Sequence, residues 1–237
     1  MPNSGQLHWD QRDGRVAAVA AAVVYSLWAL EVLLPGGGDV QGALADPGTA
    51  FGAFLDSAHR TAAVLVVIAA GIGLALGARV TGVWLALSWW AMAVFGASSL
   101  LASVFPGPCL VSTDVACAAE SLAEGIPGAT AAQAVLAVVA VLAALVGVGS
   151  LAVDRFRAGD RAWAAVAVLA VLQAAVAAAV LVVAARVSGA GDGSPGVALG
   201  LLERGHLAAV ALWLLAAGVL PGPWKRSRAA RTAGLSR

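Results

Sequence analysis

Apolar residues run along this chain in six long blocks, separated by short segments that carry most of its polar residues. A helix needs about 20 mainly apolar residues to cross roughly 30 Å of hydrocarbon, and each block is about that long. The blocks do not alternate, as the strands of a membrane barrel would, and backbone polar groups in lipid are satisfied within helices. We therefore expect six spans, near Val16–Leu34, Thr61–Ala78, Val83–Val104, Ala131–Val153, Ala162–Ala185 and Val197–Leu220.

Composition excludes a soluble domain. The chain is 61% hydrophobic and only 11% charged, whereas about a quarter of the residues in soluble proteins are charged. The predicted fold class is all-α: a polytopic membrane protein forming a six-transmembrane-helix bundle. Residues 1–15 are expected to be a cytoplasmic N-tail, residues 16–220 the transmembrane domain, and residues 221–237 a basic cytoplasmic C-tail.

The charge pattern predicts the orientation. Lys and Arg favour cytoplasmic segments, and most of them fall in the two tails and in every second loop. These residues are Arg12, Arg15, Arg79, Arg155, Arg157, Arg161, Lys225, Arg226, Arg228, Arg231 and Arg237. The other three loops are acidic, so both termini are predicted to be cytoplasmic. One Lys against thirteen Arg, in a chain rich in Ala, Val, Leu and Gly, is typical of GC-rich coding, which indicates a bacterial cytoplasmic (inner) membrane.

The two cysteines of the chain, Cys109 and Cys117, lie in the predicted outer loop between spans three and four. Disulfides persist on that side of the membrane, and a bridge across so short a loop would contribute roughly 2–3 kcal/mol. We expect a structural disulfide, with two free thiols as the alternative. No metal site is expected, since no histidine lies nearby and zinc takes four ligands.

Charged and titratable side chains within or beside the spans are the candidate functional residues, because such groups are expensive in a membrane. Seven are predicted to lie in its outer half: Glu31, Asp56, His59, Arg60, Glu203, Arg204 and His206. Glu31 or Glu203 is expected to pair with Arg204 or Arg60, since an unpaired buried charge is strongly destabilising. The cluster is interpreted either as a clasp that fixes helix packing or as a site for a lipid headgroup or small anion, gripped by arginine.

Several functions remain open at this stage. The favoured hypothesis is a protein, not an enzyme, that binds or senses an envelope lipid or assists a lipid-handling partner. The alternatives are a small-solute transporter, a membrane scaffold, or a haem or quinone redox protein using His59 and His206. No hydrolase, P-loop or metalloprotease motif is present, so no catalytic residue or cofactor is expected. The expected partners are membrane lipids or another membrane protein, not nucleic acid.

Tryptophans near the span ends are predicted to be interfacial anchors. Trp163 and Trp224 occupy such positions. Trp84, Trp89 and Trp90 in span three are expected to make packing or lipid contacts.

A set of landmarks spread over the six spans resembles a known family. The landmarks are Leu30-Glu31-Val32-Leu33-Leu34-Pro35, Phe54-Leu55-Asp56, Phe105-Pro106 with Cys109, Ser112, Asp114 and Cys117, and Glu203-Arg204 followed by Trp213. They are similar to the bacterial six-span family named domain of unknown function 998, over nearly the whole chain. The resemblance implies a fold and a location. It also favours a lipid-related role, because that family is distantly similar to eukaryotic six-span proteins tied to lipid regulation.

The chain departs from that family where span four begins. Gln133 is the polar residue there, whereas family members often carry a histidine. The resemblance therefore transfers no chemistry that depends on that histidine.

Overall fold

The computed structural model describes residues 10–33, 49–76, 82–103, 129–190, 198–220 and 224. These residues form seven helical elements, listed in chain order: α1 (Gln11–Tyr25), the 3₁₀-helix η1 (Leu27–Leu33), α2 (Ala50–Leu76), α3 (Val83–Ala102), α5 (Ala129–Arg157), α6 (Trp163–Ala190) and α7 (Ala198–Val219). The described residues contain six helices long and apolar enough to cross a membrane, with α1 and η1 together forming the first. The all-helical six-span prediction is therefore confirmed.

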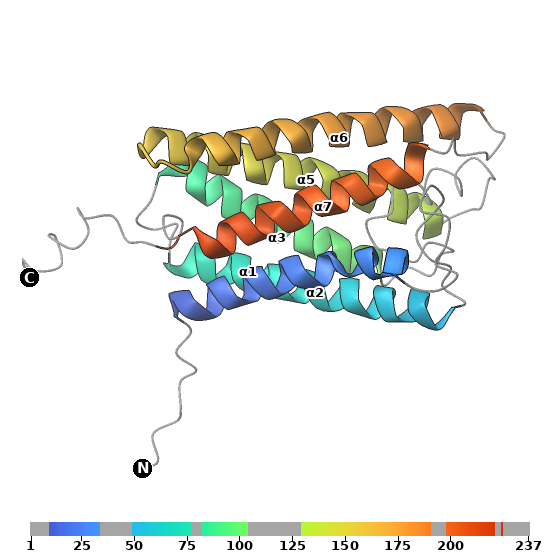
Figure 1. Ribbon diagram of the computed structural model, residues 1–237, viewed down its shortest axis with the longest axis horizontal. Helices are drawn as coiled ribbons and strands as arrows, with labels where there is room; N and C mark the ends of the chain where they lie inside the picture. The colour runs from blue at the N-terminus through green and yellow to red at the C-terminus, as the bar shows by residue number, and fades with distance from the viewer. Residues whose placement is uncertain are drawn as a thin grey trace, which may run out of the picture.

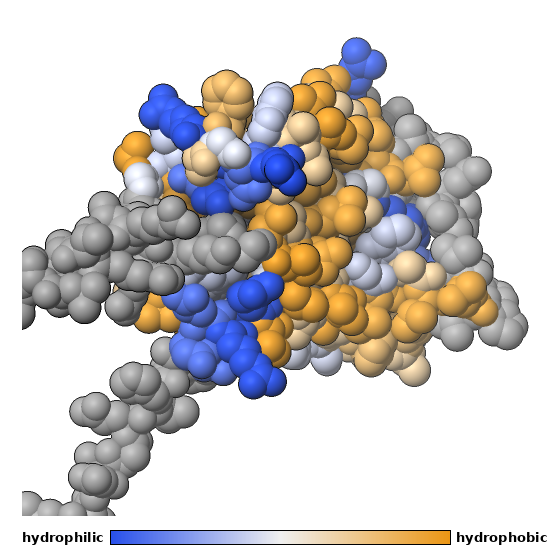
Figure 2. Space-filling model, turned by 60° about the vertical axis from the view of Figure 1, so that its left-hand side comes forward, coloured by the Kyte–Doolittle hydropathy of each residue, from blue (hydrophilic) through white to orange (hydrophobic). Residues whose placement is uncertain are grey.

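The six spans form a closed ring in which chain neighbours are spatial neighbours. Each of α1, α2, α3, α5, α6 and α7 packs against the next, and α7 returns to pack against α1. Figure 1 shows the helices running side by side along the long axis, with α1 beginning and α7 ending at the same end. We call that end proximal (Gln11, Leu76, Val83, Arg157, Val219) and the other end distal (Leu33, Ala50, Ala102, Ala198). Figure 2 shows a broad apolar surface bordered by hydrophilic residues at the proximal end.

Two predicted boundaries require correction. The second span begins at Ala50 instead of Thr61, because the polar residues before Thr61 continue the same helix. Its start is capped by the Thr49 hydroxyl, which accepts from the Gly52 amide at 3.0 Å. The first span begins at Gln11, where Asp10 and Asp13 form a capping box, and it tightens into η1 beyond Tyr25.

The contact between α1 and α7, which we call the seam, closes the ring. At the proximal end of the seam, Arg15 of α1 forms hydrogen bonds to α7. Arg15 Nε donates to the Gly218 carbonyl and Arg15 Nη2 to the Val219 carbonyl, both at 2.8 Å. These carbonyls belong to the last turn of α7, which has no further helical donors. The guanidinium of α1 therefore caps the C-terminus of α7.

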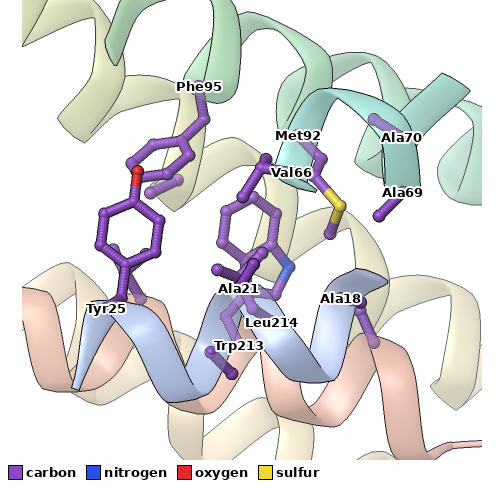
Figure 3. Packing of buried hydrophobic residues seen from close by; sticks show 14 of the residues in the cluster. Ala18, Ala21, Tyr25, Val66, Ala69, Ala70, Met92, Phe95, Trp213 and Leu214 are labelled. Carbon is purple, nitrogen blue, oxygen red and sulfur yellow. The ribbon is translucent and has the colours of Figure 1, made fainter. Parts of the chain in front are cut away.

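Large aromatic side chains fill the interior of the ring. Figure 3 shows Trp213 of α7 at the centre of a cluster that includes Met92, Phe95 and Val66. Phe95 and Trp213 meet edge to face, with ring centroids 6.0 Å apart.

Three indole rings each lie on a glycine of another helix. A Cβ added at Gly147 would come 2.3 Å from Trp213 Cζ2, one at Gly73 would come 2.4 Å from Trp89 Cδ2, and one at Gly14 would come 2.5 Å from Trp224 Cζ3. Lipid tails are as apolar as the side chains, so helix association in membranes depends on such close packing.

Trp224 corrects the prediction of two interfacial anchors. Trp163 is 41% exposed at the start of α6, but Trp224 is only 2% exposed. Its ring centroid lies 4.7 Å from that of Trp89, and its Nε1 donates to the Ala217 carbonyl at 2.7 Å. Because Gly14 leaves room for the indole, Trp224 enters the proximal end of the bundle.

Alanine at Gly147 or Gly73 should destabilise the bundle. An extra methyl group in a well-packed core typically costs about 1–3 kcal/mol, and both indoles are almost fully buried. Gly149 and Gly71 provide matched controls on the same helices, since a Cβ at either would meet nothing within 4 Å. Thermal unfolding in detergent should show a lower Tm for Gly147→Ala and Gly73→Ala only; equal effects at all four positions would contradict the packing described.

The orientation is predicted by the arginines at the proximal end. Five arginines lie there, at the ends of α1, α5 and α6: Arg12, Arg15, Arg155, Arg157 and Arg161. We expect a fluorescent protein fused after residue 237 to fold and fluoresce, and alkaline phosphatase at the same point to be inactive. The reverse pattern would place the proximal end outside the cell.

Candidate functional site

Buried polar side chains from all six spans gather between the middle of the bundle and its distal end. We call this set the polar layer: Tyr25, Glu31, His59, Ser98, Ser99, Gln133, Gln173, Glu203, Arg204 and His206, each at most 7% exposed. Each helix thus contributes at least one member. Polar groups at such depth in a membrane are costly and commonly functional, so the polar layer is the candidate site.

An ion pair across the α1–α7 seam is the charged part of the layer. Arg204 Nη2 of α7 donates to Glu31 Oε2 of η1 at 2.9 Å, and the two side chains are 2% and 5% exposed. Arg204 Nη1 also donates to the Gly200 carbonyl one turn earlier, at 3.2 Å. Glu31 and Arg204 form one of the pairings expected from the sequence. The pair fastens the seam at its distal end, as Arg15 does at its proximal end.

The segment that presents Glu31 is a seven-residue 3₁₀-helix. Such helices seldom exceed three or four residues, because their hydrogen bonds are poorer than those of an α-helix. Interrupted helices at membrane depth occur where the chain is buried in protein or lines a polar site. The packing of η1 is mainly against α1 and α2, so the long side chain of Arg204 reaches across from α7.

A second part of the layer joins α1, α2 and α3. The rings of Tyr25 and His59 lie 5.3 Å apart, and Ser99 lies beside the Tyr25 hydroxyl. Figure 3 shows Tyr25 extending from α1 toward Phe95 on α3; their ring centroids are 5.8 Å apart.

This second part contains unsatisfied polar atoms. Within the described residues, no hydrogen bond of good geometry reaches either ring nitrogen of His59, the Tyr25 hydroxyl or the Ser99 hydroxyl. A buried unsatisfied polar group costs about 1–3 kcal/mol, and native structures leave few of them. These atoms therefore indicate a place for the polar atoms of water or a ligand.

A third part of the layer connects α5, α6 and α7 with their neighbours. Gln173 Nε2 donates to His206 Nδ1 at 3.0 Å, and Gln133 Nε2 donates to the Ala102 carbonyl of α3 at 3.4 Å. His59 and His206 thus have different neighbours, one packed on Tyr25 and the other bonded to Gln173.

The structure brings five of the seven predicted residues into the layer and leaves two outside. Asp56 and Arg60 pair with each other along α2 at 2.5 Å, and their side chains are 23% and 53% exposed. Adjacent residues of a helix point about 100° apart, so Arg60 faces outward where His59 faces inward. Sequence reasoning missed Tyr25 and Ser99; the signal available for the first was that it is the single tyrosine of the chain.

Other site predictions remain untested. Cys109 and Cys117 lie outside the described residues, and so does their proposed disulfide. Among the residues that are described, no group of three or more His, Cys, Asp or Glu could hold a metal ion.

Comparison with known proteins gave no match among family models, curated proteins or solved structures. The resemblance to domain of unknown function 998 therefore remains a prediction made from the sequence landmarks.

Removing one member of the buried pair should destabilise the protein more than removing an exposed arginine. Arg204→Ala leaves Glu31 buried without its partner, which typically costs about 3–5 kcal/mol. Arg60→Ala breaks an exposed pair worth about 0–1 kcal/mol. The difference should appear in detergent unfolding midpoints, and the double variant Glu31→Gln/Arg204→Met should recover much of the loss. Equal midpoints for the two single variants would contradict the buried clasp.

Proposed function

We propose that this multi-pass membrane protein binds the headgroup of a membrane lipid in its polar layer. The observation that carries the proposal is the set of buried, unsatisfied polar atoms on Tyr25, His59 and Ser99; Tyr25 lies six residues before Glu31 of the ion pair that fastens the seam. A lipid headgroup offers phosphate or hydroxyl oxygens that accept from these donors, and this would remove the desolvation cost described above.

The Glu31–Arg204 pair supplies the charged contact of the proposed site. Arginine binds phosphate and carboxylate with the same planar fork of donors. A headgroup phosphate could therefore replace Glu31 as the partner of Arg204, and the displaced Glu31 carboxylate would then take up a proton, because a buried unpaired charge is strongly destabilising. Exchange at this point would loosen the distal end of the α1–α7 seam, which gives the bundle a way to respond to the lipid.

The depth of the layer supports binding over transport across the membrane. Along the bundle axis, the described part of the stretch from the depth of Gln173 to that of Arg155 at the proximal end has few buried polar side chains. These include Ser88 and Ser150. The Ser88 hydroxyl is already bonded to the Gly147 carbonyl at 2.8 Å. A transported solute would need polar groups continuing to the proximal end, whereas a lipid headgroup enters from one side only.

A variant that keeps the fold but removes the polar contacts tests the proposal. We expect Glu31→Gln/Arg204→Met combined with His59→Leu to carry one lipid fewer than the wild-type protein, because neither the Glu31 and Arg204 charges nor the His59 imidazole then remains to hold a headgroup in the polar layer. Native mass spectrometry of protein extracted gently from its own membranes would count the bound lipid and identify its class.

Asp56→Asn/Arg60→Gln is the matched control, since it removes an equal number of charges from the same half of the bundle. This control should retain the lipid at the wild-type stoichiometry. If the folded triple variant carries as many lipids of that class as the wild type, or if the wild type carries lipids only in bulk membrane proportions, the proposal is wrong.

A further inference from the structure

A groove lies on the α1–α7 seam at the opposite, proximal end of the bundle. It has a volume of about 980 Å³, toward the large end of ligand pockets, and it is formed by the first turns of α1, the end of α7 and Leu76 of α2. None of the polar-layer residues lines it. Val16 on its wall is 59% exposed, so the groove opens to the outside of the bundle.

The walls of the groove change from charged to apolar along α1. Arg12 and Arg15 line its outer part, and Val16, Val19 and Ala20 line the part deeper in the membrane. At 1.5 Å per residue, Val19 lies about 10 Å further along the helix than Arg12. Figure 2 shows the same change on the molecular surface, where hydrophilic residues at the proximal end border the apolar band.

Two arginines, Arg12 and Arg15, and one acid, Asp10, line the groove, so its described lining carries a net positive charge. The Asp10 carboxylate accepts from the amides of Arg12 and Asp13, and the Asp13 carboxylate accepts from the amide of Asp10, so both serve the capping box of α1. No described acid forms an ion pair with Arg12, which is exposed. Arg15 uses Nε and Nη2 on α7 carbonyls, and its Nη1 still has protons to donate.

We infer that this groove binds one anionic phospholipid of the proximal leaflet. The phosphodiester would lie against Arg12 and the free edge of Arg15, and the first part of an acyl chain would lie along Val16, Val19 and Ala20. Two arginines at headgroup level above an apolar wall match an anionic amphiphile in both charge and polarity. This site is separate from the polar layer and does not depend on the function proposed for it.

The full-length protein in detergent, titrated with phosphatidylglycerol and followed by native mass spectrometry, provides the test. Arg12→Gln should lower the affinity of the first bound phosphatidylglycerol about five-fold, the effect of roughly one basic residue near an anionic surface. Val16→Trp, which places an indole in the apolar part of the groove, should lower it as well. Arg161→Gln is the matched control, because Arg161 is also exposed at the proximal end but lies in the turn between α5 and α6.

The arms of the experiment separate a lipid site from general charge effects. Phosphatidylcholine should bind more weakly than phosphatidylglycerol, and inorganic phosphate alone should not displace the lipid at millimolar concentration. An equal loss in Arg161→Gln, equal binding of the two lipids, or displacement by phosphate would each overturn the inference. The triple variant of the polar layer should keep this lipid, so failure of the distal site and failure of this groove are distinguishable.

Discussion

Closure of the ring between its first and last helices is the constraint on which the rest of the structure depends. The two helices on either side of this seam come from opposite ends of the chain, so no short loop holds them together. Two arginines do so instead, in opposite directions: Arg204 reaches from α7 to Glu31, and Arg15 reaches from α1 to the final carbonyls of α7. Hydrophobicity alone cannot fasten this seam, because lipid competes equally for apolar surface.

Close packing inside the ring works together with these polar fastenings. Each central indole lies on a glycine of another helix, and this lets bulky rings fill the interior without forcing the helices apart. The polar layer occupies the distal part of the same interior, where its side chains join neighbouring helices by hydrogen bonds. The aromatic rings thus set the spacing of the helices, and the polar groups set which faces meet.

The sequence predicted the number and approximate position of the spans because long apolar runs have no other stable state in lipid. It placed the start of α2 incorrectly, since hydropathy cannot separate a polar loop from a helix whose first turns project beyond the hydrocarbon. A helix of 27 residues is about 40 Å long, whereas the hydrocarbon is about 30 Å thick. The boundary of α2 therefore depended on capping at Thr49, which hydropathy does not measure.

For the site, the rule that buried charges need partners was enough to propose that Glu31 or Glu203 pairs with Arg204 or Arg60. That rule could not distinguish Arg204 from Arg60, because the distinction depends on which face of α2 turns inward. The sequence also did not predict that Tyr25 and Ser99 belong to the polar layer, because the rule applies to charged side chains and a hydroxyl group carries no charge. Which polar residues share a layer is decided by helix rotation and ring order, and neither can be read from a single chain.

The separation of Glu31 and Arg204 also affects how the protein is made. The two residues lie 173 positions apart, and at about 5–20 residues per second the ribosome needs roughly 9 to 35 seconds to pass from one to the other. During that interval Glu31 has been synthesised, whereas Arg204, its partner in the folded bundle, has not. Assembly of the ring is therefore completed only after the last helix has been made, because the seam joins the first helix to the last.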